Sequence, residues 1–274
     1  MNDAPPTQSI LTPDMREGVV AIARAAAAAI LTVYESEFAV AHKDDRSPLT
    51  AADLAAHHAI VDGLARLTPD VPVLSEESAH EVRAEERRQW PRLWVVDPLD
   101  GTREFIKRNG EFTVNIALVE HGVSTFGVVL APVTGVAWHG GAEIGACRRS
   151  AEGERVLRVR APATAPLRVA ASRSHRDART EAFLGAMGDI EPIGLGSSLK
   201  FCLIAEGGLD AYPRFGPTSE WDTAAAQAVL EGAGGRVIDL RGRPFRYNQR
   251  DTVLNGEFIA LGDPALPWRR WLDA

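Results

Sequence analysis

The most constraining feature of the sequence is an apolar run that ends in two aspartates three positions apart. Residues 93–96 are Leu-Trp-Val-Val and predict a buried strand, which Asp97 and Asp100 follow. A proline and a glycine then turn the chain into a helix expected over residues 102–106. Two carboxylates at a strand end, beside a helix N-terminus, indicate a site for hard cations with an anion bound on top. Taken alone, the stretch is better explained as an ordinary turn.

Length and charge bound the classes of protein that this chain can represent. Its 274 residues suit one large domain or two subdomains. The net charge, 30 − 37 = −7, argues against a nucleic-acid-binding surface. A polyphosphate ligand is still compatible with this charge, because bound metal ions supply positive charge that the count omits. We therefore expect a small-molecule partner and no nucleic acid, with no particular oligomeric state predicted.

Cysteine usage and the N-terminus favour a cytoplasmic protein. The two cysteines, Cys147 and Cys202, form no CxxC motif and no Cys/His cluster, which fits a reducing compartment. The first 13 residues lack the basic and apolar regions of a signal peptide. The alanine-rich run over residues 21–31 is interrupted by Arg24 and is too short to span a bilayer. Peripheral attachment to a membrane stays open as an alternative.

Helices followed by strands are predicted in the first half of the chain. The pattern predicts helices over residues 13–34 and 50–67, and strands over 71–74, 93–96, 112–118, 125–130, 135–139 and 145–149. Residues 112–118 alternate with period two, which is typical of a half-buried antiparallel strand. The first half is therefore expected to be two helices plus a largely antiparallel sheet.

Strands and helices alternate in the second half, which indicates an α/β arrangement. The pattern predicts strands over residues 167–171, 191–194, 211–212 and 236–239, and helices over 177–187, 198–206 and 219–232. The Pro/Ala-rich segment 160–166 is the best boundary candidate. We accordingly divide the chain into an N-terminal half, 1–164, and a C-terminal half, 165–274.

Acidic residues recur where predicted elements begin or end. The positions are Asp53, Glu76, Asp97, Asp100 and Asp222. Asp53 and Asp222 could each close a helix capping box begun by Thr50 and Ser219, and Glu76 with Glu77 could be a solvated pair. Their joint pattern favours another interpretation, because oxygen ligands without His or Cys select Mg²⁺ or Mn²⁺ over zinc. Carboxylates around two or more such ions suit in-line phosphoryl transfer to water. No Walker motif is present.

Several longer stretches carry a family resemblance. They are residues 47–53 (SPLTAAD), 74–77 (LSEE), 97–102 (DPLDGT), 101–118 (GTREFIKRNGEFTVNIAL), 172–175 (SRSH), 196–202 (GSSLKFC), 212–217 (YPRFGP) and 220–222 (EWD). These motifs resemble the inositol monophosphatase superfamily of lithium-sensitive, Mg²⁺-dependent phosphatases. The match is closer to its 3′(2′),5′-bisphosphate nucleotidase branch of the bacterial CysQ type. They extend from about residue 43 to about residue 235.

The resemblance implies a fold, a metal site and a catalytic pair. The fold would be a layered αβαβα sandwich of mixed α+β and α/β character, with the active site between its halves. Two or three Mg²⁺ ions, for which Mn²⁺ could substitute, would be held by Glu76, Asp97, the Leu99 carbonyl, Asp100 and Asp222. Asp53 and Thr102 would orient the attacking water. Asp100, Gly101 and Thr102 would hold the scissile phosphate, and these ligand positions would also contact the substrate.

The resemblance also implies contacts to a nucleotide and its second phosphate. His175, Ser197, Lys200 and Arg214 match such positions, although from the residues alone a loop histidine and solvated surface charges are the simpler explanation. One departure separates this chain from the inositol phosphatases, whose inositol-binding glutamate is replaced here by Phe215. A carboxylate suits sugar hydroxyls, whereas Lys and Arg suit a second phosphate.

The activity implied by the resemblance is removal of the 3′-phosphate of adenosine 3′,5′-bisphosphate, giving AMP and phosphate. The cellular process implied with it is sulfate assimilation. Related 2′,5′-bisphosphates and sulfated nucleotides are plausible substrates. An inositol or sugar-phosphate phosphatase is the alternative within the enzyme class. A nucleotide sensor without turnover is the alternative outside it, and the presence of both Asp53 and Thr102 counts against a sensor.

Overall fold

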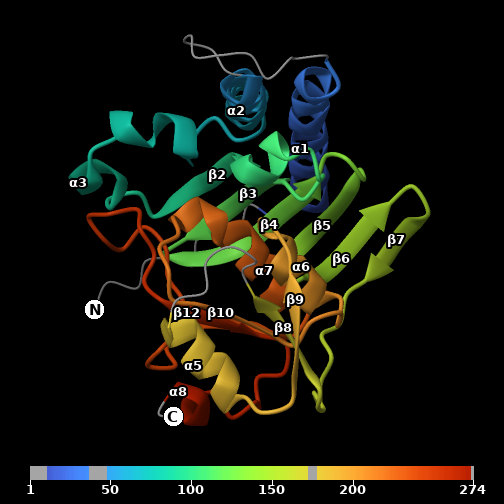
Figure 1. Ribbon diagram of the computed structural model, residues 1–274. Helices are drawn as coiled ribbons and strands as arrows, with labels where there is room; N and C mark the ends of the chain where they lie inside the picture. Colours follow the sequence, from blue (N-terminus) through green and yellow to red (C-terminus); the bar gives the residue numbers. More distant parts are fainter. Residues whose placement is uncertain (1–10, 37–47, 172–177, 273–274) are drawn as a thin grey trace.

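The computed structural model describes residues 11–36, 48–171 and 178–272, which form two β-sheets with helices on their faces (Figure 1). The first sheet has seven strands that follow the chain order from one edge to the other. These are β1 (Val73–Ser75), β2 (Arg92–Asp100), β3 (Thr113–Glu120), β4 (Val123–Ala131), β5 (Val136–Gly141), β6 (Gly145–Ser150) and β7 (Gly153–Val156). β1 and β2 pair parallel, because a helical crossover joins them, and the later pairs are antiparallel.

Short helical segments carry the chain around the edge of this sheet. They are η1 (Glu76–Glu81) and α3 (Ala84–Arg87) between β1 and β2, and α4 (Thr102–Ile106) after β2.

Two long helices, α1 (Pro13–Tyr34) and α2 (Pro48–Leu67), cover one face of the first sheet (Figure 1). The Thr12 hydroxyl caps α1 by accepting a hydrogen bond from a backbone N–H of the first turn. The helices approach closely because small residues lie at their interface. A Cβ added at Gly63 of α2 would lie 2.7 Å from the side chain of Ile22.

Within the described ranges, α1 is the one helix long and apolar enough to cross a membrane by length and composition. The run over residues 21–31, on which the prediction was based, is part of this longer helix of 22 residues. Its buried side chains, among them Val19, Ala23 and Ile30, pack with α2 and the sheet in one hydrophobic cluster. This packing is typical of a core helix.

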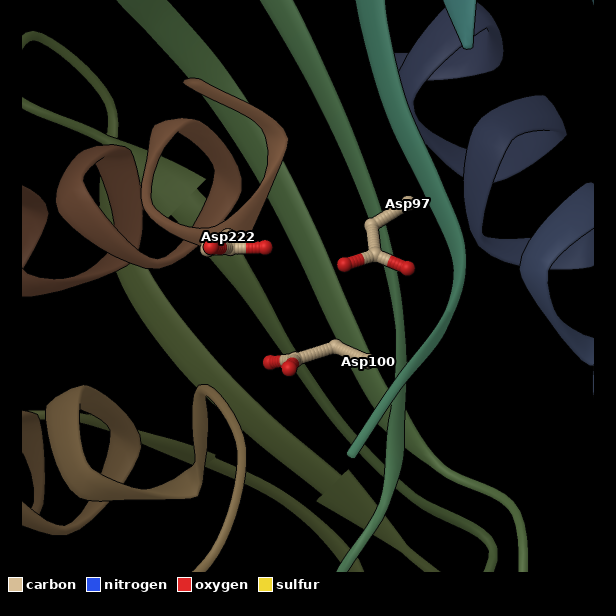
Figure 2. A group of neighbouring side chains, drawn as sticks. All are labelled: Asp97, Asp100 and Asp222. Carbon is tan, nitrogen blue, oxygen red and sulfur yellow. The ribbon is translucent and has the colours of Figure 1, made fainter. Parts of the chain in front are cut away.

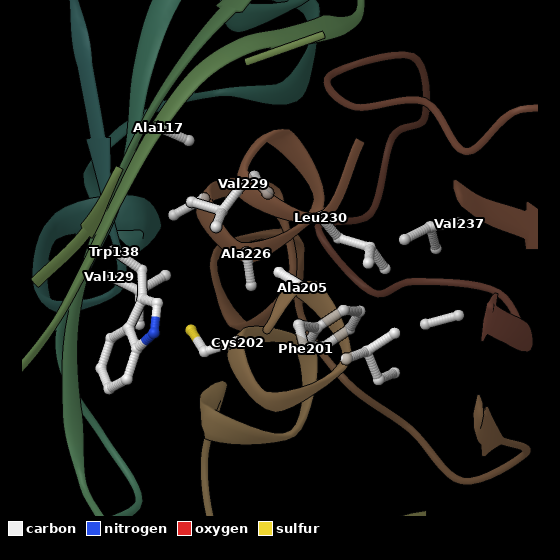
Figure 3. Close-up of a cluster of buried hydrophobic side chains, with 14 of the residues drawn as sticks. Ala117, Val129, Trp138, Phe201, Cys202, Ala205, Ala226, Val229, Leu230 and Val237 are labelled. Carbon is white, nitrogen blue, oxygen red and sulfur yellow. The ribbon is translucent and has the colours of Figure 1, made fainter. Parts of the chain in front are cut away.

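The other face of the first sheet packs against α6 (Leu199–Ala205) and α7 (Ala224–Gly232), which lie between the two sheets. Figure 3 shows part of this central cluster, where Trp138 and Val129 of the sheet meet the helices. The approach is close at Gly127 of β4, where an added Cβ would lie 2.1 Å from the Ala225 carbonyl oxygen.

The second sheet has the strand order β11-β12-β10-β8-β9. Its strands are β8 (Leu167–Ala171), β9 (Ile190–Gly194), β10 (Ala211–Arg214), β11 (Arg236–Asp239) and β12 (Phe258–Leu261). The helices α5 (Ala178–Ala186) and α8 (Trp268–Leu272) pack on its outer face, where Phe183 and Trp271 meet edge to face.

The layers therefore alternate as α, β, α, β, α, and the predicted αβαβα sandwich is confirmed. The central hydrophobic cluster contains residues from both sides of the 160–166 segment, so the two parts share a core. The division at residue 164 stays a prediction about domain organisation.

Three expectations about elements are wrong. β3 is not half-buried: seven of its eight residues are buried, because α7 covers the face opposite α1. The helix expected over residues 219–232 is a 3₁₀ turn, η2 (Glu220–Asp222), followed by α7. The second helix begins at Pro48, so Thr50 lies inside it and cannot be the N-cap that the Asp53 capping box requires. β7, β12 and α8 were not predicted.

Candidate active site

The two aspartates of the opening motif lie at a bulge at the end of β2. Asp97 pairs with Asn115 and Asp100 pairs with Thr113, so three steps along β2 oppose two steps along β3. Residues three apart in a regular strand point to opposite faces, and one extra residue brings them to the same side. Gly101 then turns the chain with φ 99°, where an added Cβ would lie 3.1 Å from a backbone oxygen.

Asp222 joins these two aspartates from the second half of the chain (Figure 2). Carboxylate oxygens of Asp97, Asp100 and Asp222 all lie within 4.8 Å of one another. The predicted capping box at Ser219 is confirmed, because the Ser219 N–H donates to Asp222 Oδ2 at 2.7 Å. Asp222 therefore both completes the capping box with Ser219 and contributes a carboxylate to the cluster.

Ser198 connects the three chain segments that form the site. Its N–H donates to Asp100 Oδ2 at 2.6 Å, and its hydroxyl lies 2.8 Å from both Asp100 Oδ2 and the Asp222 carbonyl oxygen. The hydroxyl also accepts a hydrogen bond from Asn115 Nδ2 at 2.9 Å. Ser198 and Asn115 are buried, so they hold Asp100 in a fixed orientation. Neither was predicted to have a role, because the bridge exists only in the folded chain.

Crowding of carboxylates in a buried place raises their pKa values. Burial, followed by the nearby charges of Asp100 and Glu76, raises the pKa of Asp97 well above its usual range. Burial and the charge of Asp100 raise the pKa of Asp222 to about 7. A cluster in which anions repel in this way is stabilised by protons or by cations.

Glu76 lies at the edge of the same cluster. It is the first residue of η1, directly after β1, and its charge is among those that raise the pKa of Asp97. Burial and the charges of Asp100 and Glu77 raise its pKa. The position of Leu99, between the two aspartates of β2, is fixed by its N–H, which donates to Asp97 Oδ1 at 3.1 Å.

Asp53 approaches the cluster from α2 and is 8% exposed. Burial and the charges of Glu77 and Glu76 raise its pKa to about 8. Its Oδ1 atom has no hydrogen-bond partner among the residues that the structure describes. Thr102 is exposed at the first position of α4, a helix that contacts α2. The pairing of Asp53 with Thr102 stays a prediction.

A pocket of about 150 Å³ opens beside the aspartates. It is lined by Asp100, Gly101, Glu104, Ser197, Lys200, Phe201, Tyr212, Arg214, Thr218, Asp222, Thr223 and Phe258. Ser197, Lys200 and Arg214 thus lie in one pocket with two members of the aspartate cluster. The predicted contact His175 falls outside the described residues.

Lys200 is buried in this pocket rather than solvated. It is 9% exposed, donates from Nζ to the Ser197 carbonyl oxygen at 2.6 Å, and lies over the Tyr212 ring. Burial lowers its pKa to about 8. Arg214 donates to the carbonyl oxygens of Gly216 and Pro217 at 3.3 and 3.0 Å.

The contacts of Phe215 are those of a packing residue and not of a ligand-binding residue. Its ring packs edge to face on Phe183 of α5 at a centroid distance of 5.4 Å. The aromatic residue that stands here instead of the carboxylate expected of an inositol phosphatase is thus engaged in packing on α5.

The residues at the aspartate cluster fit a site for divalent cations. The donors are carboxylates from β2, η1 and η2, an oxygen-only set that suits Mg²⁺ or Mn²⁺. The pKa values of Asp97 and Asp222 are raised, and Asp53 Oδ1 has no hydrogen-bond partner among the described residues. Both features are expected of buried carboxylates whose charge is not balanced by a cation.

Comparisons with known proteins agree with this geometry. The family model described as the inositol monophosphatase family matches residues 13–262. The chain is 51% identical over 246 residues to the 3′(2′),5′-bisphosphate nucleotidase CysQ of Escherichia coli K12, covering 89% of this chain and 98% of the relative. A CysQ crystal structure from Bacteroides thetaiotaomicron matches with a TM-score of 0.84 at 40% identity, covering 93% of this chain and 99% of that one.

An inositol monophosphatase structure from Zymomonas mobilis matches more distantly, with a TM-score of 0.76 at 27% identity over 97% of this chain and 100% of that one. The protein is therefore a metal-dependent phosphatase in class, and it belongs to the inositol monophosphatase family. Within that family, its half identity over most of the chain is to nucleotidases of the CysQ type.

Proposed function

We propose that this protein is a 3′(2′),5′-bisphosphate nucleotidase that converts adenosine 3′,5′-bisphosphate into AMP and phosphate. The observation that carries the proposal is the shared pocket. In it, the buried Lys200 side chain and Arg214 lie next to Asp100 and Asp222. A substrate with two phosphates suits that arrangement, one phosphate at the aspartates and one at the cations.

We infer that Glu76, Asp97, Asp100, Asp222 and the Leu99 carbonyl hold two or three Mg²⁺ ions. When bound, these ions lower the pKa of the attacking water and stabilise the leaving oxygen. Mn²⁺ satisfies the same oxygen ligands.

The chain's own residues then orient the reactants. Backbone N–H groups of Gly101 and Thr102, at the start of α4, would hold the scissile phosphate. The Thr102 hydroxyl would accept a hydrogen bond from the attacking water and donate its own to Asp53. Asp53 Oδ1, which has no partner within the described part of the chain, would be the acceptor for that hydroxyl. Asp53 is the base in this scheme and would take up the proton of the attacking water through Thr102.

The cationic end of the pocket would select the substrate. Lys200 would bind the non-reacting phosphate, with Arg214 and Ser197 beside it and His175 as a further contact outside the described residues. Phosphoadenylyl sulfate and 2′,5′-bisphosphates carry the same two-anion pattern and belong to the same substrate class. We place this activity in sulfate assimilation and in the cytoplasm, where free Cys147 and Cys202 are compatible with a reducing environment.

Phosphate release from a matched panel of substrates tests the proposal. With Mg²⁺, kcat/KM for adenosine 3′,5′-bisphosphate should exceed that for an inositol monophosphate by about tenfold or more, since one charged contact contributes roughly 1.5–3 kcal/mol. Asp97→Asn, which keeps the size of the side chain, should abolish turnover and leave the fold intact. A faster reaction with the inositol phosphate would support the alternative function, and wild-type activity in Asp97→Asn would refute the metal assignment.

A further inference from the structure

A buried arginine lies at the start of a hydrogen-bond network that ends at the turn carrying Asp222. Arg87, the last residue of α3, is 2% exposed. Its Nη1 donates to Asn248 Oδ1 at 2.9 Å, and its Nη2 donates to the carbonyl oxygens of Arg250 and Asp251 at 2.9 and 2.8 Å. Asn248 Nδ2 donates back to the Arg87 carbonyl oxygen at 2.6 Å. The guanidinium therefore fixes the loop that contains these acceptors.

The same loop holds both carboxylate oxygens of Glu220. The Asn248 N–H donates to Glu220 Oε2 at 2.7 Å, and Arg250 Nη2 donates to Glu220 Oε1 at 3.0 Å. Asn248 makes its contact from the left-handed backbone region, with φ 53°. Glu220 is fully buried, so these partners and the nearby charge of Arg87 decide where its side chain can lie.

Glu220 is the first residue of η2 and Asp222 is the last. The turn has little freedom of its own, because Asn255 Nδ2 donates to the Ser219 carbonyl oxygen at 2.6 Å and to Thr223 Oγ1 at 3.0 Å. A displacement of Glu220 would therefore move the whole turn, and with it the carboxylate of Asp222.

We propose that Arg87 is a positioning residue for Asp222, acting through the loop and Glu220 on the affinity of the site for its divalent cations. The proposal rests on the assignment of Asp222 as a metal ligand in the proposed function. α3 follows η1, whose first residue is Glu76, so the network links the segment of one ligand to the turn of another. Partners that orient metal ligands typically affect metal affinity by about 10- to 100-fold when they are removed.

Arginine is required here because its planar fork serves three acceptors at once. A lysine at this position could not reach Asn248 and two carbonyl oxygens in one plane. A purely structural arginine would contribute to stability without affecting how the cluster binds metal. Metal affinity, measured without substrate, distinguishes these two roles.

The test compares Arg87→Met with a matched control in the same protein. Arg160→Met is the control, because Arg160 donates hydrogen bonds to a fully buried residue, Asp210, at 2.7 Å, and makes no contact with η2 among the contacts described for Arg160. Mn²⁺ binding is measured calorimetrically without substrate, below the melting temperature of the least stable variant. We expect Arg87→Met to bind Mn²⁺ about tenfold more weakly or worse, and Arg160→Met to bind it as the wild type does.

A second readout uses turnover. The Mg²⁺ concentration for half-maximal phosphate release should rise in Arg87→Met by the same factor as the Mn²⁺ dissociation constant, with kcat at saturating Mg²⁺ within about threefold of wild type. Equal Mn²⁺ affinity in Arg87→Met and wild type would overturn the proposal, as would equal weakening in Arg160→Met.

If Arg87→Met does not fold, Glu220→Gln tests the same network. This variant keeps the side-chain volume and one acceptor oxygen, but it presents an NH₂ group to Arg250. It should also weaken Mn²⁺ binding, and unchanged affinity would count against the network. A wild-type protein that binds Mn²⁺ without hydrolysing bisphosphates would refute the proposed function alone, because the affinity comparison does not depend on substrate. A wild-type protein that binds no Mn²⁺ would refute the role of Arg87 as well.

Discussion

Removal of the Lys200 charge should weaken binding of substrates with two phosphates and of no others. Lys200→Met keeps the apolar stem that packs in the pocket and removes the ammonium group. A buried, charge-assisted contact to phosphate contributes roughly 1.5–3 kcal/mol, which corresponds to a rise in KM of about 10- to 150-fold. Because this contact is the same in the ground state and the transition state, kcat should change little.

The assay is initial-rate phosphate release with adenosine 3′,5′-bisphosphate and, as the matched control, adenosine 3′-monophosphate. The control substrate lacks only the second phosphate, so its KM should change by less than about threefold in Lys200→Met. If both substrates lost affinity equally, Lys200 would contact the scissile phosphate and the assignment would be wrong.

The same side chain predicts a pH dependence. Burial lowers the Lys200 pKa to about 8 in the free protein, so the ammonium charge is present below that pH and lost above it. KM of the wild type for the bisphosphate should therefore rise as the pH increases above 8, whereas KM of Lys200→Met should not follow this rise. A pH profile that is identical in the two proteins would contradict this reasoning.

Three further predictions address the carboxylates and their partners. Asp53→Asn and Thr102→Ala should each lower kcat by about 10²–10⁴, and the double variant should be little worse than either, since the pair acts as a unit; additive losses would separate the two residues. Asp53 has a pKa raised from 3.8 to about 8, so the folded protein holds a proton that the unfolded chain releases, and metal-free stability should fall as pH rises between these values. Denaturant titrations should show a smaller fall in Asp53→Asn, and equal slopes would refute the assignment. Ser198→Ala should raise the Mg²⁺ requirement roughly tenfold, whereas an unchanged requirement would mean that Asp100 is held without it.

The opening motif shows how much of the site can be predicted from sequence. The apolar run and the turn residues were sufficient to predict the strand and the helix start, whereas a cation site at Asp97 and Asp100 was predicted only when the other acidic residues were considered with them. The bulge that brings these carboxylates to the same side was not predictable, because it depends on the register against β3. Glu76 and Asp222 were assigned to the site from the pattern of acidic residues and from the family resemblance. In the folded chain both lie at the cluster.

Two of the failures share a physical cause, which is contact between segments distant in sequence. β3 was expected to have a solvated face, but α7, about a hundred residues later, covers it. Ser198 had no assigned role, because its partners come from three other segments. The Asp53 cap failed for a local reason, since the helix starts at Pro48, three residues before the Ala51 start that its capping pattern suggests.

The central claim, hydrolysis of the 3′-phosphate, is tested most directly by following the reaction of adenosine 3′,5′-bisphosphate by ³¹P NMR with Mg²⁺ present. The account predicts that the 3′-phosphate signal is lost while the 5′-phosphate signal persists, with AMP and inorganic phosphate as the products in equal amounts. Loss of the 5′-phosphate, giving adenosine 3′-monophosphate, or persistence of both signals under these conditions, would contradict it.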